Sequence, residues 1–188
     1  MDKKKGFNVY YLLVSEGTAE FNLFAYLTKN KFKALFEQSK IKFSPKIEIV
    51  EAGISQGKLL GIGNIGVFRS KYKLIRKCYN GQTRFFLLDK DLDDSSEIGT
   101  LIKQGKDIVQ FIEYNSEYLL LKLADKNPRN PADFNDMGCF RDYCKSEFAK
   151  QFKKNASDFK DVDFDLVFSN VGDEEIRSIF AELFSTLS

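Results

Sequence analysis

Four short apolar runs alternate with helix-length segments along the first 124 residues of the chain, at residues 7–15, 46–50, 83–88 and 107–113. The runs are rich in β-branched and aromatic residues, which predicts strands, and the segments between them predict helices near 18–38, 65–79 and 97–104. Strands separated by helices form right-handed βαβ units. The pattern therefore predicts an α/β fold with a central, mainly parallel sheet of four to five strands, flanked by helices.

The rest of the chain lacks further strand signals. A leucine-rich segment at 116–124 predicts a helix, a proline-containing loop follows at 127–131, and two more helices are expected near 134–154 and 173–187. A chain of 188 residues suits one domain better than two, and there is no long linker to divide it. We expect a single domain over 1–188, with a core at 7–124 and a C-terminal helical extension at 125–188 packed on it.

Histidine is absent from the sequence, and the three cysteines, Cys78, Cys139 and Cys144, form no CxxC pair. These absences exclude a histidine-based catalytic triad and nearly every zinc site, since both need imidazole or clustered thiolates. The apolar runs are too short to span a membrane. We therefore expect a cytoplasmic protein without membrane contact, whose chemistry depends on carboxylates, lysines, hydroxyls and a bound cation.

Residues 52–88 contain no Asp or Glu but carry seven basic side chains. A solvated helix face is the ordinary explanation for such a run. A phosphate-bearing partner is the alternative, favoured because the basic stretch leads directly into an acidic loop. The candidate nucleic-acid-binding residues are Lys58, Arg69, Lys73, Arg76 and Lys90.

Acidic residues follow two of the expected strands. Glu16 and Glu20 flank the turn after the first strand, while Asp89 and Asp91 follow the strand at 83–88, with Asp94 close behind. Acidic residues are common at such positions for structural reasons alone. However, ligands bind at the carboxyl ends of parallel strands, and converging carboxylates repel each other unless a hard cation lies between them. The pairing of the two clusters predicts a Mg²⁺ or Mn²⁺ site.

These residues resemble the motifs of the Toprim family. A strand runs into Glu-Gly at Val14–Glu20 (VSEGTAE), and a later strand ends in Asp-x-Asp at Phe86–Asp91 (FLLDKD). The second glutamate four residues on is similar to the small stand-alone Toprim proteins and to nucleases of the overcoming-lysogenization-defect type. Glu117, at the start of a leucine-rich helix, resembles a further motif of that group. The resemblance covers about residues 7 to 124.

The resemblance implies a Toprim-like, Rossmannoid fold and metal-dependent hydrolysis of phosphodiesters in DNA or RNA. In that family mechanism Asp89, Asp91 and Glu20 would hold one or two Mg²⁺ or Mn²⁺ ions, Glu16 would be a ligand or a general base, and Glu117 would support the second metal position. Glu16, Asp89 and Asp91 are thus the catalytic candidates. A homodimer or a larger complex is possible. The alternative is a catalytically inactive Toprim-like module that binds or regulates.

Three other motifs compete with this interpretation. Residues 53–58 look like a phosphate loop but are one residue short, and Leu59 replaces the hydroxyl residue. Residues 61–66 match the dinucleotide fingerprint, which would make the protein an oxidoreductase, but the preceding strand is expected to end near Ala52. Asp161, Asp163 and Asp165 alternate like a calcium loop but lack its glycine and closing glutamate, so we expect them to be solvated.

Overall fold

The computed structural model describes residues 8–59, 62, 64–90 and 94–187. Within these residues six strands form one sheet, in the order β3-β4-β1-β5-β6, with β2 also pairing with β1. All pairings are parallel except that between β3 and β4. The strands are β1 (Val9–Ser15), β2 (Ile41–Ser44), β3 (Ile54–Ser55), β4 (Lys58–Leu59), β5 (Thr83–Asp89) and β6 (Ile108–Ile112). The predicted α/β class with a mainly parallel sheet is confirmed, and the sheet has more strands than expected.

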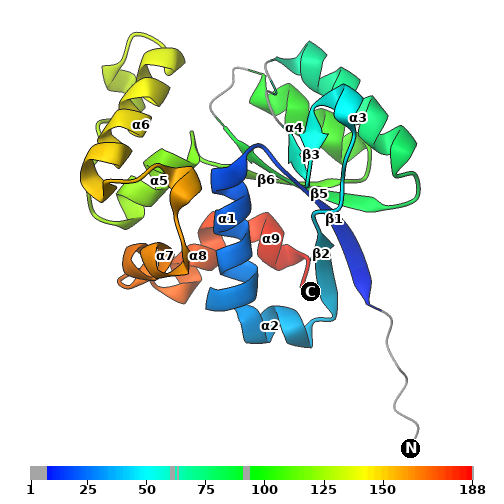
Figure 1. Cartoon of the computed structure of the whole chain (residues 1–188), viewed down its shortest axis with the longest axis horizontal. Helices are drawn as coiled ribbons and strands as arrows, with labels where there is room; N and C mark the ends of the chain where they lie inside the picture. The colour runs from blue at the N-terminus through cyan, green and yellow to red at the C-terminus, as the bar shows by residue number, and fades with distance from the viewer. Residues whose placement is uncertain (1–7, 60–61, 63, 91–93, 188) are drawn as a thin grey trace, which may run out of the picture.

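Helices cover both faces of the sheet (Figure 1). The helices α3 and α4 lie on one face, and α1 and α9 lie on the other, next to the C-terminal helices α5 to α8. The bounds are α1 (Thr18–Tyr26), a π-helix (Leu27–Lys31), α2 (Lys33–Gln38), α3 (Ile65–Cys78), α4 (Ser95–Gln104), α5 (Ser116–Leu123), α6 (Met137–Phe152), α7 (Asp161–Phe168), α8 (Asp173–Ile179) and α9 (Ala181–Ser185).

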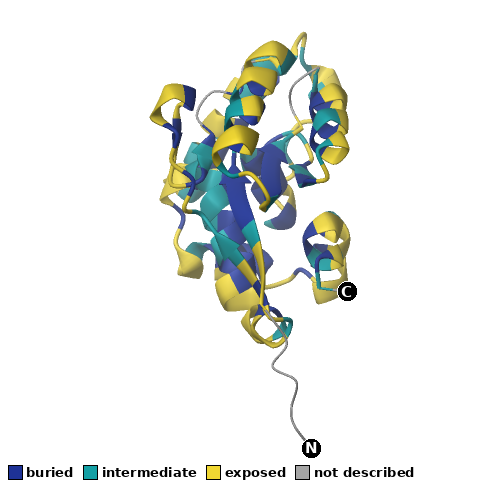
Figure 2. Cartoon of the chain, turned by 90° about the vertical axis from the view of Figure 1, so that its right-hand side faces the viewer, coloured by how far each residue is buried: buried dark blue, intermediate teal, exposed yellow. Residues whose placement is uncertain are grey.

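The central strand β5 connects the two layers of the core. Phe85 and Leu87 pack against α1 and the C-terminal helices, while Phe86 and Leu88 pack against α3 and α4. This division follows from the alternation of side chains along a strand. Figure 2 shows the same pattern from the side, with the sheet buried and the outer helix faces exposed.

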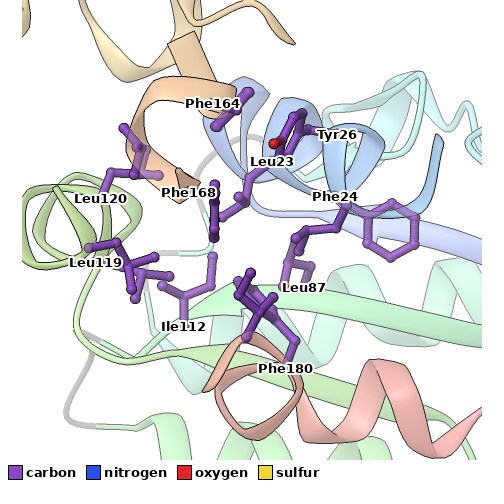
Figure 3. Close-up of a cluster of buried hydrophobic side chains, with 14 of the residues drawn as sticks. Leu23, Phe24, Tyr26, Leu87, Ile112, Leu119, Leu120, Phe164, Phe168 and Phe180 are labelled. Carbon is purple, nitrogen blue, oxygen red and sulfur yellow. The ribbon is translucent and has the colours of Figure 1, made fainter. Parts of the chain in front are cut away.

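The C-terminal helices share the core of the α1 face. Tyr26 stacks on Phe164 and Phe168 of α7, with ring centroids 5.1 and 5.5 Å apart (Figure 3). The Tyr26 hydroxyl donates a 2.8 Å hydrogen bond to Asp165. Burial of the ring is the main cause that raises the pKa of Tyr26 well above its usual value, and this hydrogen bond is the second. Residues of 125–188 therefore contribute to the same hydrophobic cluster as residues of the strand–helix core.

Outside the glycine-rich segment, two predictions of secondary structure were wrong. Residues 46–50 do not form the expected strand, and β2 lies at Ile41–Ser44 instead. Ile47 and Ile49 are both buried, so the segment 46–50 has the alternating burial pattern of a strand although it is an irregular loop. The second error concerns Asp161–Phe168, where the alternating aspartates did not suggest the helix α7 that the structure contains. Those aspartates are also not all simply solvated: Asp163 accepts hydrogen bonds from Lys154 Nζ and the Lys160 amide, and these contacts lower the pKa of its carboxyl group.

A buried ion pair fixes the start of β5 against the start of β6. The Arg84 guanidinium lies 3.2 Å from Asp107, and the two side chains are 5% and 1% exposed. Asp107 also accepts hydrogen bonds from the Arg84 amide and from the Tyr72 hydroxyl on α3. Arg84 thus neutralises a buried carboxylate, although sequence alone groups it with the basic stretch at 52–88.

Asp107→Ala is expected to lower the free energy of unfolding by about 3–5 kcal/mol, because it leaves the Arg84 charge buried without its partner. Urea denaturation followed by circular dichroism measures the change. The exposed pair Lys33–Glu37 is the matched control, since Glu37→Ala should change stability by less than about 1 kcal/mol. Equal effects of the two substitutions would contradict a structural role for the Arg84–Asp107 pair.

Candidate functional site

Three neighbouring parallel strands end at the same edge of the sheet. Ser15 of β1 pairs with Leu87 of β5, and Asp89 of β5 pairs with Ile112 of β6. The chain leaves β1 for α1 on one face and leaves β5 for α4 on the other. Connections that diverge in this way open a crevice between the two strand ends, which is where ligands bind in α/β sheets.

The β3–β4 hairpin places Lys58 beside this edge. Gln56 and Gly57 both have positive φ, at 50° and 74°, as a tight two-residue hairpin requires. The Ser15 amide donates a 2.7 Å hydrogen bond to the Gly57 carbonyl, and Ser15 pairs in parallel with Lys58. A side chain at Gly57 would lie 2.6 Å from the Leu13 carbonyl oxygen, so the close approach requires glycine.

Glu16 ties the ends of β1 and β5 together. Its Oε2 atom accepts a 3.0 Å hydrogen bond from the Asp89 amide, and its own amide donates to the Leu87 carbonyl. The two acidic motifs therefore lie at the same edge and in direct contact, as their placement after adjacent parallel strands predicts. This contact orients the backbone from which the Asp89 carboxylate projects.

Glu20 is only 5% exposed, and a hydrogen bond from α5 holds its carboxylate. The Ser116 hydroxyl at the start of α5 donates a 2.5 Å hydrogen bond to Glu20 Oε1. A Cβ atom at Gly17 would come within 2.9 Å of Glu20 Oε2, so glycine leaves room for the carboxylate. The Asn115 side chain caps α5 by accepting from the Tyr118 amide, which fixes the serine next to it.

A cavity of about 420 Å³ brings three of the predicted metal ligands together. We call it the carboxylate cavity. Glu20 from α1, Asp89 from β5 and Glu117 from α5 line it, while Glu16 is not among the lining residues but accepts a hydrogen bond from the Asp89 amide. The other lining residues come from the turn after β1 and from the C-terminal extension: Gly17, Thr18, Ala19, Lys145, Phe148, Asn155, Ala156 and Ser157.

Sequence reasoning missed the contribution of the extension to this cavity. Lys145 of α6 supplies a positive charge among the carboxylates, and the 155–157 turn supplies polar groups. The Asn22 side chain donates a 3.0 Å hydrogen bond to the Ser157 carbonyl, which fastens this turn to α1. No short motif links residues 135 positions apart, so only the folded chain identifies them.

The donor chemistry of the carboxylate cavity suits Mg²⁺ or Mn²⁺, because every acidic ligand is a hard oxygen. Among the described residues no three Asp, Glu, Cys or His side chains form a ready metal-binding group. Mg²⁺ commonly uses only one or two carboxylates and keeps waters or substrate phosphates as its other ligands. Asp91, another of the predicted ligands, lies outside the described residues.

The candidate nucleic-acid-binding residues do not form a single patch. Arg69, Lys73 and Arg76 are exposed along α3. Arg76 lies roughly 16 Å along the helix from its first residue, by the usual helical rise, and its guanidinium is 5.8 Å from the centroid of the Tyr72 ring. Tyr72 contacts Asp107, just before β6, so Arg76 lies toward the opposite edge of the sheet from Lys58 and Lys90.

The dinucleotide-fingerprint candidate at 61–66 lies between a strand and a helix. A short strand, β4, does precede the glycine run at 61–66, and α3 follows it, so the expectation that the preceding strand ends near Ala52 was wrong. However, the amide of Ile65, the first residue of α3, donates a 2.8 Å hydrogen bond to Asp94. A carboxylate thus occupies the position where a dinucleotide phosphate would bind. Gly61 and Gly63 lie outside the described residues.

The phosphate-loop candidate at 53–58 forms the β3–β4 hairpin and does not lead into a helix, as a phosphate loop must. Burial raises the pKa of Tyr118, the neighbour of Glu117, so this hydroxyl keeps its proton at neutral pH and is no candidate base.

No helix among the described residues is long and apolar enough to cross a membrane. The chain matches no protein-family model, and searches of curated proteins and of solved structures give no match.

The Ser116–Glu20 hydrogen bond is expected to couple the two side chains by about 1.5–3 kcal/mol, as hydrogen bonds to buried charged groups do. A double-mutant cycle of Ser116→Ala and Glu20→Ala, read by urea denaturation, measures this coupling. The exposed pair Gln151–Glu147 on α6 provides a matched cycle with a much smaller value. A coupling near zero for Ser116 and Glu20 would show that α5 does not position the glutamate.

Proposed function

We propose that the protein is a metal-dependent phosphodiesterase acting on nucleic acid. The observation that carries the proposal is the carboxylate cavity, in which Glu20, Asp89 and Glu117 from three separate elements face a common space beside Lys145. A divalent cation bound in this cavity would offset the cost of bringing the like charges of these residues together. The position at the ends of β1 and β5 is also where α/β sheets bind ligands.

The cation would be held by Asp89, with Glu20, Glu117 and Asp91 as further oxygen ligands. When bound, it would lower the pKa of a water molecule and neutralise charge on the scissile phosphate. Glu16 would act as a positioning residue, because its carboxylate holds the Asp89 amide. A backbone held at Asp89 would present its carboxylate from a defined position when the substrate arrives.

Lysines would supply the complementary charge for the phosphates. Lys145 lines the carboxylate cavity, and Lys58 and Lys90 lie at the same edge of the sheet. The nucleic-acid backbone would continue from there along the first turns of α3, past Arg69 and Lys73. Such contacts position the strand without reading its sequence.

The arrangement also supports the Toprim-like interpretation. Glu16 follows β1, Asp89 ends β5, and Glu117 lies after β6, at the start of α5. The strands β1, β5 and β6 are adjacent and parallel. That order matches the order of the motifs on which the resemblance rests. The cytoplasmic location expected from the sequence would suit an enzyme acting on intracellular nucleic acid.

A catalytically inactive binding module is the second candidate, and one observation favours it. The Ser116 hydroxyl already donates a hydrogen bond to Glu20 Oε1, so the protein itself satisfies this carboxylate oxygen without a cation. Such a module would bind nucleic acid through the same lysines but would not cleave it.

Asp89→Asn is expected to abolish Mg²⁺- or Mn²⁺-dependent cleavage of nucleic acid, a loss of at least about a hundredfold, since the amide removes the main charge for the cation. Glu174→Gln, on the exposed first turn of α8, is the control and should cleave normally. Cleavage is measured on labelled single- and double-stranded DNA and RNA, with and without EDTA. Manganese binding, followed by electron paramagnetic resonance, should weaken in parallel.

Cleavage that survives Asp89→Asn would place the activity elsewhere or in a contaminant. Wild-type binding of nucleic acid without cleavage under any metal would favour the inactive module. Neither binding nor cleavage would overturn both candidates.

Substituting Arg69 and Lys73 together by Gln is expected to weaken nucleic-acid binding and to lower the salt slope of log Kd by about two, one for each phosphate that the variant no longer neutralises. Arg76→Gln should change the slope less, because Arg76 lies toward the far edge of the sheet. Fluorescence anisotropy at several salt concentrations measures both. A larger effect of Arg76→Gln would move the binding path to the opposite edge.

A further inference from the structure

We propose that a second hollow, between α1, α2 and β2, binds a small amphipathic anion that carries one carboxylate on an apolar body. We call it the lysine-rimmed pocket. It has a volume of about 370 Å³, which lies within the range of small-molecule sites. Nothing in the proposed phosphodiesterase function uses this pocket.

Apolar and aromatic side chains form the walls. Phe24 of α1, Phe36 of α2 and Phe43 of β2 line the pocket, with Leu13 and Ile41. The Phe43 ring packs edge-on against Phe24, with centroids 4.9 Å apart, and against Phe36 at 6.1 Å. Rings fixed in this way give a preformed apolar surface, so a ligand would bind without the entropic cost of ordering the walls.

The charge at the pocket is unbalanced. Three lysines, Lys29, Lys33 and Lys42, line it together with a single acidic residue, Glu37. Glu37 lies 3.9 Å from Lys33. Lys29 and Lys42 make no ion pair with any residue that the structure describes. Two exposed ammonium groups beside an apolar hollow are complementary to an anion with an apolar body.

An irregular backbone lies at the same place. The chain between α1 and α2 forms a π-helix at Leu27–Lys31, and two of its residues, Thr28 and Lys29, line the pocket. The Thr28 hydroxyl donates a 2.9 Å hydrogen bond to the Phe24 carbonyl within this stretch. Wide turns of this type are rare and occur frequently at functional sites. The π-helix is independent of the charge pattern and points to the same location.

The pocket is distinct from the carboxylate cavity, although α1 borders both. Glu20 at the start of α1 faces the carboxylate cavity, whereas Phe21, Phe24 and Ala25 face the lysine-rimmed pocket. The two sets of lining residues have no member in common. A ligand in the pocket would therefore not compete with a cation at Asp89.

Isothermal titration calorimetry of the full chain with octanoate, octanol and octylammonium tests the proposal. These probes share one apolar body and differ in the charge of the head group. Octanoate should bind at least about fivefold more tightly than octanol, and octylammonium should bind more weakly than both. Lys29→Gln with Lys42→Gln should reduce octanoate affinity about fivefold, as expected from two partly exposed charge pairs, and leave octanol unchanged.

Lys103→Gln with Lys126→Gln is the matched control, since both lysines are exposed and line neither this pocket nor the carboxylate cavity. Ala25→Phe, which fills the pocket, should abolish binding of octanoate and octanol alike, with folding checked by circular dichroism. Octanoate binding no tighter than octanol, or unaffected by the Lys29 and Lys42 substitutions, would overturn the proposal. Those two lysine variants decide the question even where Ala25→Phe fails to fold.

Discussion

Burial of β5 on both faces is the constraint on which the other elements depend. A strand without a solvent-facing side needs a helical layer on each face, and Phe85, Phe86, Leu87 and Leu88 are each no more than 1% exposed. Each such side chain contributes about 1.5–3 kcal/mol by leaving water. The same burial admits no charged side chain between Arg84, which Asp107 neutralises, and Asp89, where the strand reaches the edge. The candidate site begins where the apolar run of β5 ends.

The two layers explain why the site lies where it does. The connection after β1 enters the α1 layer and the connection after β5 enters the α3–α4 layer, so the strand ends between them remain accessible. Glu16 bridges these ends through the Asp89 amide, and the serine that opens α5 orients Glu20. Both contacts join residues from different elements. The acidic residues are thus oriented by the packing of the sheet and helices, and each element supplies one part of the constellation.

The helix α1 borders two hollows of different chemistry. Its first turn carries Glu20 into the carboxylate cavity, and its following turns place Phe21 and Phe24 in the lysine-rimmed pocket. The other face of the helix packs on α7 through Tyr26. A helix that is largely enclosed by a sheet, a second helical layer and two hollows has little amphipathic character, which is why its sequence is apolar on nearly every side.

The sequence by itself determined the fold class, the main parallel strands and the placement of Glu16 and Asp89 after β1 and β5. These follow from short-range patterns: uncharged β-branched and aromatic runs favour buried strands, and residues that follow parallel strands must lie at one edge. Only the tertiary structure decided that β2 lies at Ile41–Ser44, that Asp94 occupies the start of α3, and that Lys145 and Ser157 line the cavity. These features depend on contacts between residues distant in the chain, for which the local sequence carries no periodic signal. They also depend on how β2 and β4 share one edge of β1, since each of these strands is too short to cover that edge alone.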